Sequence, residues 1–306
     1  MTMKILYMGS GYRPLEKLSS RPDISITGVY IRPNPLIENP KKTYPFVNYI
    51  EELCQKKNLT IHQPEKMTPE VIENIISEEY DILVSCGYHL LIPEKVVNSA
   101  RIAAINIHPG KLPEYRGQSV IEWAMLNGED ELYMTMHLIT NKFDDGEILM
   151  ETPVSFKDTD TGNILQGKLY TAAANMLDTF LDDPKKYLAA KRKQELGGNY
   201  YHRIKESDLK INWSENYQKI KNITRAMVYP RDGAYGYIGG EKIIIDKVLP
   251  LDSYNSLKTN TPGEILKIND SEIYIASKDS VLSIPLDAIR NYFIIHDKIK
   301  LGEIIK

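Results

Sequence analysis

Residues 4–31 read KILYMGSGYRPLEKLSSRPDISITGVYI, and this stretch decides the fold class. A short apolar run over 4–8 is followed by a glycine-rich turn, and residues 14–20 have the pattern of a helix. A second apolar run over 24–31 predicts another strand. The order strand, turn, helix, strand is typical of the start of a parallel α/β sheet.

The same alternation continues over the first half of the chain, which predicts a Rossmann-like domain with a mostly parallel sheet. Thr68-Pro69-Glu70 marks one helix start, because Thr caps a helix and Pro suits its first position. Residues 32–45, rich in Pro and Asn, are expected to form a loop. Strands are expected over 59–63, 81–86, 102–107, 133–140 and 148–154, the last two antiparallel, and helices over 46–57, 93–98, 118–127 and 161–182.

The composition changes near residue 190, which predicts two domains. The polar stretch that ends in Gly197-Gly198 suits a linker. Beyond a helix over 215–227, short strands separated by turns at Gly239-Gly240, Pro262-Gly263 and Asn269-Asp270 fit a small OB-like β-barrel. We expect a catalytic domain over 1–190, a linker over 191–205 and a β-barrel domain over 206–306.

The bulk composition narrows the class of protein. A net charge of -3 over 306 residues disfavours a nucleic-acid substrate, which usually requires a positive excess. The two cysteines, Cys54 and Cys86, provide neither a disulfide framework nor metal-ligand spacing. No apolar run reaches the roughly 18 residues of a membrane span, so we expect a cytoplasmic protein. No carboxylate or cysteine cluster stands beside His62, His202 or His296, so we expect no bound metal.

Asn106 and His108 stand two residues apart at the end of an expected strand, so their side chains face the same side. An amide there can stabilise an oxyanion and an imidazole can transfer a proton. A carboxylate in the loop 141–146 could orient that imidazole. An isolated Asn-x-His pair is nevertheless common at strand ends. We interpret His137 as packed or hydrogen-bonded, and His89 as a loop residue without a catalytic role.

The stretches NIHPGKLPEYRG (106–117) and FDDGEIL (143–149) together resemble the signature of the 10-formyltetrahydrofolate-dependent formyltransferases. The resemblance extends over the whole chain. In the second half it is similar to the C-terminal barrel of methionyl-tRNA and sugar-nucleotide formyltransferases. The segments that carry this part are DLKINW (208–213), NITRAM (222–227), DGAYGY (232–237) and PGEIL (262–266).

The resemblance implies catalytic roles for three residues. Asn106 would bind the formyl oxygen, His108 would stabilise the intermediate and shuttle protons, and Asp144 would hold His108. Asp145 is the alternative carboxylate, although the motif matches Asp144. The donor N10-formyltetrahydrofolate would be a co-substrate bound by Tyr88, Leu90, Ile92, Thr140 and Asp144.

The resemblance also places the amine substrate against the loop that follows the first strand. A simple tight turn is the alternative for that glycine-rich loop, and bracing of its own loop is the alternative for Arg116. The residues implied for the substrate are Gly9, Ser10, Tyr12, Arg13, Lys111 and Arg116.

Three hypotheses about the function remain open, and two of them differ in the acceptor. The loop 32–42 is short and has few basic residues, and Trp123 and PRDGAYGY (230–237) resemble the sugar-type enzymes. These features favour the amine of a dTDP- or UDP-linked amino-deoxy sugar, as used in lipopolysaccharide biosynthesis. Methionyl-tRNA is the second candidate, and a binding module that has lost the chemistry is the third. Hydrolysis of the formyl donor to formate is a further enzymatic alternative. The oligomeric state, for which a homodimer is one possibility, and the role of the barrel are left open.

Overall fold

The computed structural model describes residues 2–33, 45–195, 197–251 and 261–306. The chain divides into two compact units that are not continuous in sequence. The first unit contains Met1–Val120, Glu131–Ser155 and Gln166–Tyr201, and the second contains Ile121–Asp130, Phe156–Leu165 and His202–Lys306. The expected loop 32–45 falls largely outside the described residues.

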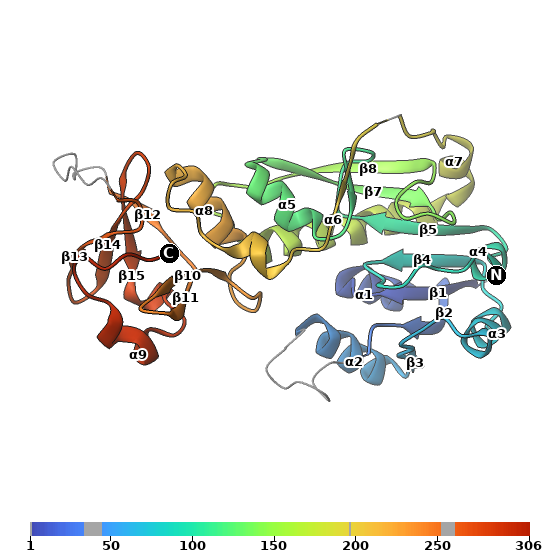
Figure 1. The fold of residues 1–306 in the computed structure, drawn as a ribbon. Coiled ribbons are helices and arrows are strands. Elements are labelled where there is room, and N and C mark those ends of the chain that lie inside the picture. The colour runs from blue at the N-terminus through green and yellow to red at the C-terminus, as the bar shows by residue number, and fades with distance from the viewer. Residues whose placement is uncertain (1, 34–44, 196, 252–260) are drawn as a thin grey trace. The chain divides into compact units, whose positions relative to one another are not determined.

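A seven-stranded sheet with the order β3-β2-β1-β4-β5-β7-β8 forms the centre of the first unit (Figure 1). The strands from β3 to β5 are parallel, and β7 and β8 run antiparallel at one edge. This mostly parallel sheet confirms the predicted fold class. The strands are β1 (Met3–Gly9), β2 (Ile24–Tyr30), β3 (Ile61–His62), β4 (Ile82–Cys86), β5 (Ala103–His108), β7 (Glu131–Leu138) and β8 (Ile148–Ser155).

Helices connect the parallel strands, as a sheet of this topology requires. The helix that follows Thr68 begins as expected, since the Thr68 side chain accepts a hydrogen bond from the Val71 N–H at 3.3 Å. The long helix near residue 170 turns Leu169, Met176 and Phe180 into the core. The helices of the first half of the chain are α1 (Tyr12–Ser20), α2 (Pro45–Lys57), α3 (Pro69–Ser77), α4 (Glu94–Asn98), α5 (Val120–Asn127), α6 (Gly162–Asp182) and α7 (Pro184–Ala189).

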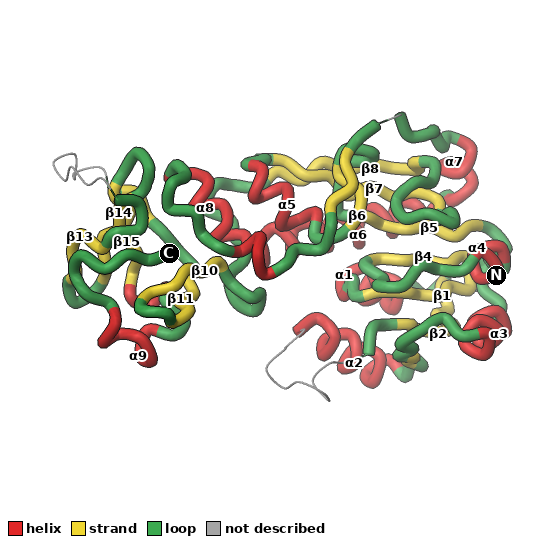
Figure 2. The backbone as a smooth tube through the Cα atoms, viewed as in Figure 1, coloured by secondary structure: helices red, strands yellow, loops and turns green. Residues whose placement is uncertain are grey.

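The second unit packs antiparallel strands around one apolar core, which agrees with the expected small barrel. A four-stranded sheet has the order β12-β15-β14-β13, and a hairpin joins β10 to β11 through Gly239-Gly240 (Figure 2). Its elements are η2 (Glu206–Leu209), α8 (Tyr217–Ala226), β10 (Ala234–Ile238), β11 (Glu241–Ile245), β12 (Leu249–Pro250), β13 (Ile265–Ile268), β14 (Glu272–Ala276), β15 (Val281–Pro285), η3 (Leu286–Ala288), α9 (Tyr292–Ile295) and η4 (His296–Lys298).

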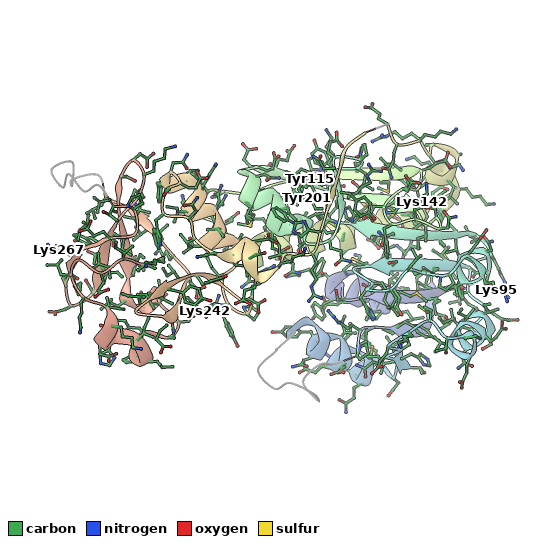
Figure 3. The ribbon with its side chains drawn as sticks, in the orientation of Figure 1. Lys95, Tyr115, Lys142, Tyr201, Lys242 and Lys267 are labelled. Carbon is green, nitrogen blue, oxygen red and sulfur yellow. The ribbon has the colours of Figure 1, made fainter. Side chains whose placement is uncertain are left out.

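Two short strands were not expected from the sequence. Strand β6 (Tyr115–Gly117) pairs in parallel with β9 (Asn199–Tyr201), which lies inside the stretch expected to be a linker. The rings of Tyr115 and Tyr201 stack with centroids 5.0 Å apart (Figure 3). Part of the 191–205 stretch is therefore structured against the first unit. Within the described residues, no helix combines the length and apolar character needed to cross a membrane.

Candidate active site

Strands β5 and β7 together place three polar side chains on one face of the sheet. Asn106 and His108 stand two residues apart on β5, and side chains at this spacing in a strand face the same side. The antiparallel neighbour β7 pairs His137 directly opposite Asn106, and directly paired residues share a face. The sheet register, which the sequence does not reveal, thus adds a second histidine to the predicted pair.

Asp144 completes the cluster from the loop after β7. Its carboxylate Oδ2 accepts a hydrogen bond from the Gly117 N–H at 2.9 Å. The other oxygen, Oδ1, lies 3.3 Å from His108 Nδ1 and 3.6 Å from His137 Nε2. The amide nitrogen of Asn106 lies 3.5 Å from the same oxygen. The structure therefore brings the three residues with implied catalytic roles into one contact group.

Burial and charge set the ionisation of this group. The side chains of His108 and Asp144 are only 6% and 7% exposed. Burial alone would raise the pKa of Asp144, but His108, His137 and the Gly117 N–H outweigh it and lower this pKa to about 2. Asp144 is accordingly a carboxylate throughout the neutral pH range.

The His108 imidazole faces an oxygen at each nitrogen. Nε2 lies 2.6 Å from the Tyr115 carbonyl oxygen, and Nδ1 faces Asp144. Burial lowers the pKa of His108, and the Asp144 charge offsets that effect only in part. The free ring is therefore neutral at pH 7, yet only the protonated ring donates to both oxygens. His108 is thus suited to accept a proton in the course of a reaction.

The His137 ring is locked in one tautomer by its surroundings. Nδ1 lies 2.8 Å from the Leu138 carbonyl oxygen and must carry the proton to make that hydrogen bond. In the neutral ring, Nε2 then accepts from the Asn106 amide nitrogen at 3.0 Å. His137 is hydrogen-bonded, as we interpreted it from the sequence. Its contact with Asn106 and Asp144, however, makes it part of the site.

Two loops predicted to bind the donor share one apolar cluster. Ile92 is buried in it, and Tyr88 and Ile139 pack against it from the loops that follow β4 and β7. Among the described residues, the backbone groups of Leu90 and Ile92 form no hydrogen bonds, and the Tyr88 hydroxyl is buried without a partner. Thr140 Oγ1 donates to the Lys142 carbonyl oxygen at 3.1 Å. Polar groups are thus available beside an apolar wall.

The glycine-rich loop after β1 lies against the end of β4. A Cβ atom at Gly9 would lie 2.0 Å from the Cys86 carbonyl oxygen, so only glycine fits there, and its φ is +132°. The Ser10 hydroxyl donates to the Gly87 carbonyl oxygen at 3.3 Å. Tyr12 donates to Glu16 at 3.1 Å, and the Arg13 side chain is exposed. This loop and the loop of Tyr88 therefore neighbour each other at the carboxyl edge of the sheet, where ligands bind in open α/β folds.

The remaining predicted residues lie around the 109–117 loop. The Lys111 ammonium is 3.4 Å from Glu114 and is half exposed. Arg116 donates to the Gly197 carbonyl oxygen at 2.5 Å and lies 3.8 Å from Asp145. Asp145 is 43% exposed and is not among the contacts of His108, in contrast to Asp144. In the described ranges, no group of three or more His, Cys, Asp or Glu side chains has the arrangement of a metal site.

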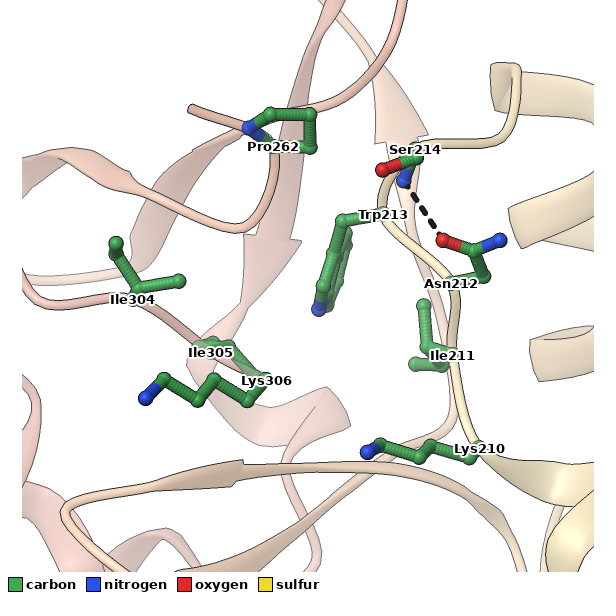
Figure 4. A pocket seen from close by; sticks show the side chains of 9 residues that line it. All are labelled: Lys210, Ile211, Asn212, Trp213, Ser214, Pro262, Ile304, Ile305 and Lys306. Atoms are coloured by element: carbon green, nitrogen blue, oxygen red, sulfur yellow. Dashed lines mark hydrogen bonds between the residues drawn. The ribbon is translucent and has the colours of Figure 1, made fainter. Parts of the chain in front are cut away.

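A separate hollow of about 370 Å³ lies in the second unit (Figure 4). Trp213 and two lysines, Lys210 and Lys306, contribute to its wall. None of the predicted site residues lines it, so it does not belong to the cluster around Asp144.

Comparison with known families identifies both halves of the chain. Residues 37–181 match the family model "Formyl transferase", and residues 203–289 match "Formyl transferase, C-terminal domain". The chain therefore belongs to the formyltransferase family of enzymes.

Individual relatives differ in function. The chain is 29% identical over 238 residues to the methionyl-tRNA formyltransferase of Thermodesulfovibrio yellowstonii, covering 78% of this chain and 75% of the relative. An N-formyltransferase from Helicobacter canadensis, solved with folinic acid and dTDP-3-aminofucose, has a similar fold. Its TM-score is 0.64 at 16% identity, with 93% of this chain and 99% of that chain covered.

A third similar fold is that of HypX from Aquifex aeolicus. Its TM-score is 0.63 at 15% identity, and the match covers 93% of this chain. The chain spans a little under half of HypX, 45% of its length.

Proposed function

We propose that the protein transfers the formyl group of N10-formyltetrahydrofolate to the amine of a nucleotide-linked amino sugar in the cytoplasm. The observation that carries the transfer is the contact group of the part-buried Asn106 with the buried His108 and Asp144 at the carboxyl edge of the sheet. An amide donor, a neutral imidazole and a carboxylate together meet the needs of acyl transfer to nitrogen.

The reaction begins with attack of the neutral amine on the formyl carbon. A carbon–nitrogen bond forms and the carbonyl oxygen becomes an oxyanion. One amide N–H of Asn106 donates to His137, and the other meets Asp144 only at 3.5 Å, so this weakly held N–H can donate to the developing oxyanion instead. His108 takes the proton from the attacking nitrogen, and its charged ring is then stabilised by Asp144 and the Tyr115 carbonyl.

Collapse of the intermediate completes the transfer. The bond between the formyl carbon and N10 breaks, and N10 receives the proton from His108. The products are tetrahydrofolate and the N-formyl sugar nucleotide. The proton that leaves the amine is the one that the leaving group gains, so no other acid or base is needed.

The folate assignment is supported by the loops of Tyr88 and Ile139. A flat heterocycle requires apolar walls and a few directed hydrogen bonds. The free backbone groups of Leu90 and Ile92 beside the apolar cluster meet that need. The Helicobacter canadensis relative was solved with folinic acid, which is consistent with the same role here.

The acceptor assignment is supported by the glycine-rich loop and by the same relative, which was solved with dTDP-3-aminofucose. Gly9 and Ser10 belong to the turn after β1, and Tyr12 and Arg13 begin α1, where the exposed Arg13 side chain and the helix N-terminus suit a nucleotide diphosphate. We therefore assign the sugar nucleotide to this side of the site, with Lys111 and Arg116 as further contacts. A role in supplying formylated sugars to lipopolysaccharide is part of the proposal.

Methionyl-tRNA is the second candidate acceptor, because the relative at 29% identity bears that name. A tRNA acceptor would give a steep decline of activity with salt, since several phosphate contacts must form. A sugar nucleotide has only two phosphates and would give a shallow one.

The test is release of tetrahydrofolate from N10-formyltetrahydrofolate with a panel of dTDP- and UDP-linked amino sugars, and with methionyl-tRNA in parallel. Turnover with a sugar nucleotide but not with the tRNA supports the proposal. Turnover with the tRNA alone contradicts it. Release without any acceptor identifies a hydrolase instead.

A further inference from the structure

Asp144 has an unusual backbone for a residue with a side chain. Its φ is +52°, in the left-handed region that most residues avoid. Such a conformation persists only where the surrounding structure holds it in place. The contacts that hold this loop therefore decide where the carboxylate stands relative to His108.

Gln194 supplies two of these contacts from a segment that the sequence predicts to be a linker. Its side chain Nε2 donates to the carbonyl oxygens of Asp144 and Gly146, each at 2.9 Å. Because both partners are acceptors, the amide nitrogen must be the atom that faces them. The amide oxygen of Gln194 is buried and has no hydrogen-bond partner among the described residues.

The chain around Gln194 is itself fixed to the first unit. Arg192 exchanges two backbone hydrogen bonds with Ile148, at 2.8 and 2.9 Å. After Gln194, strand β9 pairs with β6, and the Tyr200 hydroxyl donates to the Phe143 carbonyl oxygen at 3.4 Å. The pairing leaves the Gly117 N–H directed at Asp144. The segment thus contacts the backbone of the Asp144 turn directly. It also holds strand β6, whose Gly117 N–H donates to the Asp144 carboxylate.

We propose that residues 192–195 and 197–201 form a clamp on the catalytic loop, with Gln194 as a positioning residue for Asp144. The clamp contacts the backbone of residues 143–146 through Gln194 and Tyr200. This inference rests on the proposed function for its kinetic readout, since formyl transfer reports where Asp144 stands. A plain connector between domains would make no directed contact with Asp144 or Gly146.

Two substitutions of similar size test the role of Gln194. Gln194→Met removes both hydrogen bonds, and Gln194→Glu sets a carboxylate oxygen against two carbonyl oxygens. We expect kcat to fall by about 10- to 100-fold in both, because small displacements of a catalytic group have effects of this order. KM for the acceptor should change by less than about twofold, since none of the residues assigned to the acceptor is altered.

Lys193→Met is the matched control. Lys193 lies in the clamp, but its side chain is exposed and makes none of the contacts with residues 143–146, so its replacement should leave kcat and KM unchanged. Thermal unfolding of all three variants separates misplacement of Asp144 from loss of the fold. Activity of Gln194→Met within twofold of wild type, in a folded protein, would overturn the proposal.

Amide hydrogen exchange at Gly117 gives a readout that needs no acceptor. The Gly117 N–H is protected by Asp144 Oδ2, so a displaced Asp144 should speed its exchange by about tenfold or more. Exchange that is unchanged in both Gln194 variants would contradict the clamp, whatever the substrate. Absence of turnover in the wild-type protein with every acceptor would instead contradict the proposed function and leave this measurement valid.

Discussion

Replacement of Asp144 by Asn tests the electrostatic part of the mechanism. The change removes the charge, keeps the size of the side chain, and retains a residue that tolerates the left-handed backbone at φ +52°. In the wild-type protein, Asp144 Oδ1 lies 3.3 Å from His108 Nδ1. The variant therefore loses the counter-charge of the imidazolium that the proposed reaction forms, and one of the two acceptor oxygens becomes an amide donor.

The expected loss follows from that distance. Opposite unit charges 3.3 Å apart attract by about 5 kcal/mol at an effective dielectric constant of about 20. Reorientation of the new amide and of nearby dipoles recovers part of this energy. We expect a net loss of about 3–4 kcal/mol, which corresponds to a decrease of kcat by roughly 100- to 1000-fold.

The assay is single-turnover release of tetrahydrofolate at saturating donor and acceptor. Asp145→Asn is the control, because Asp145 is 43% exposed and is expected to change kcat by less than about threefold. A kcat for Asp144→Asn within tenfold of wild type would refute the reasoning, since His108 would then function without its partner.

Three further predictions concern the same site. His137→Leu should lower kcat by about 10- to 100-fold, because the Asn106 amide loses the acceptor that orients it. His137→Gln can still accept from Asn106 and should retain more of the kcat. Equal defects in both variants would refute the orienting role. The Asp144 carboxylate, whose pKa is lowered to about 2 from 3.8, should contribute about 2–3 kcal/mol of stability above pH 4 that is lost as the pH falls toward 2. Urea unfolding of the wild type and of Asp144→Asn should therefore diverge above pH 4 and converge near pH 2, and parallel curves would contradict this. Gly9→Ala should lower the free energy of unfolding by about 2–4 kcal/mol, because its Cβ would meet the Cys86 carbonyl oxygen. Gly240→Ala, whose Cβ meets nothing within 4 Å, should cost only about 1 kcal/mol. Equal losses in thermal unfolding would argue against the close approach at Gly9.

The sequence predicted the sheet well and placed Asn106 and His108 at the end of one of its strands, because both depend on local patterns. The strand that carries Asn106 and His108 begins as an apolar run over 102–105, and runs of this kind in an α/β alternation lie in a parallel sheet. The Thr68 cap was predicted for the same reason: the hydrogen bond that it makes lies within three residues.

The missing parts of the site depend on contacts distant in sequence. His137 joins the cluster because β7 adds beside β5, and the order of strands in a sheet is not encoded by any one strand. Strands β6 and β9 have three residues each, too few for an alternating pattern to be recognised. Gln194 lies in a polar stretch whose composition is that of a linker, and only the fold directs its amide at residues 144 and 146.

The compact units also differ from a division at a single boundary. Residues 121–130 and 156–165 group with the C-terminal part of the chain, although each lies between elements of the first unit. Such an arrangement arises from packing between segments far apart in sequence. The change of composition near residue 190 precedes only the last passage of the chain from the first unit to the second, which occurs at His202.

The central claim is that Asn106, His108 and Asp144 transfer a formyl group to a sugar-linked amine. The most direct measurement is mass spectrometry of dTDP- and UDP-linked amino sugars after incubation with N10-formyltetrahydrofolate and either the wild-type protein or His108→Ala. We expect a formylated sugar nucleotide with the wild type and at least a hundredfold less with the variant, since loss of a general acid–base catalyst costs about 10²–10⁴ in rate. Equal product from both proteins, or a formylated methionyl-tRNA in place of the sugar, would contradict it.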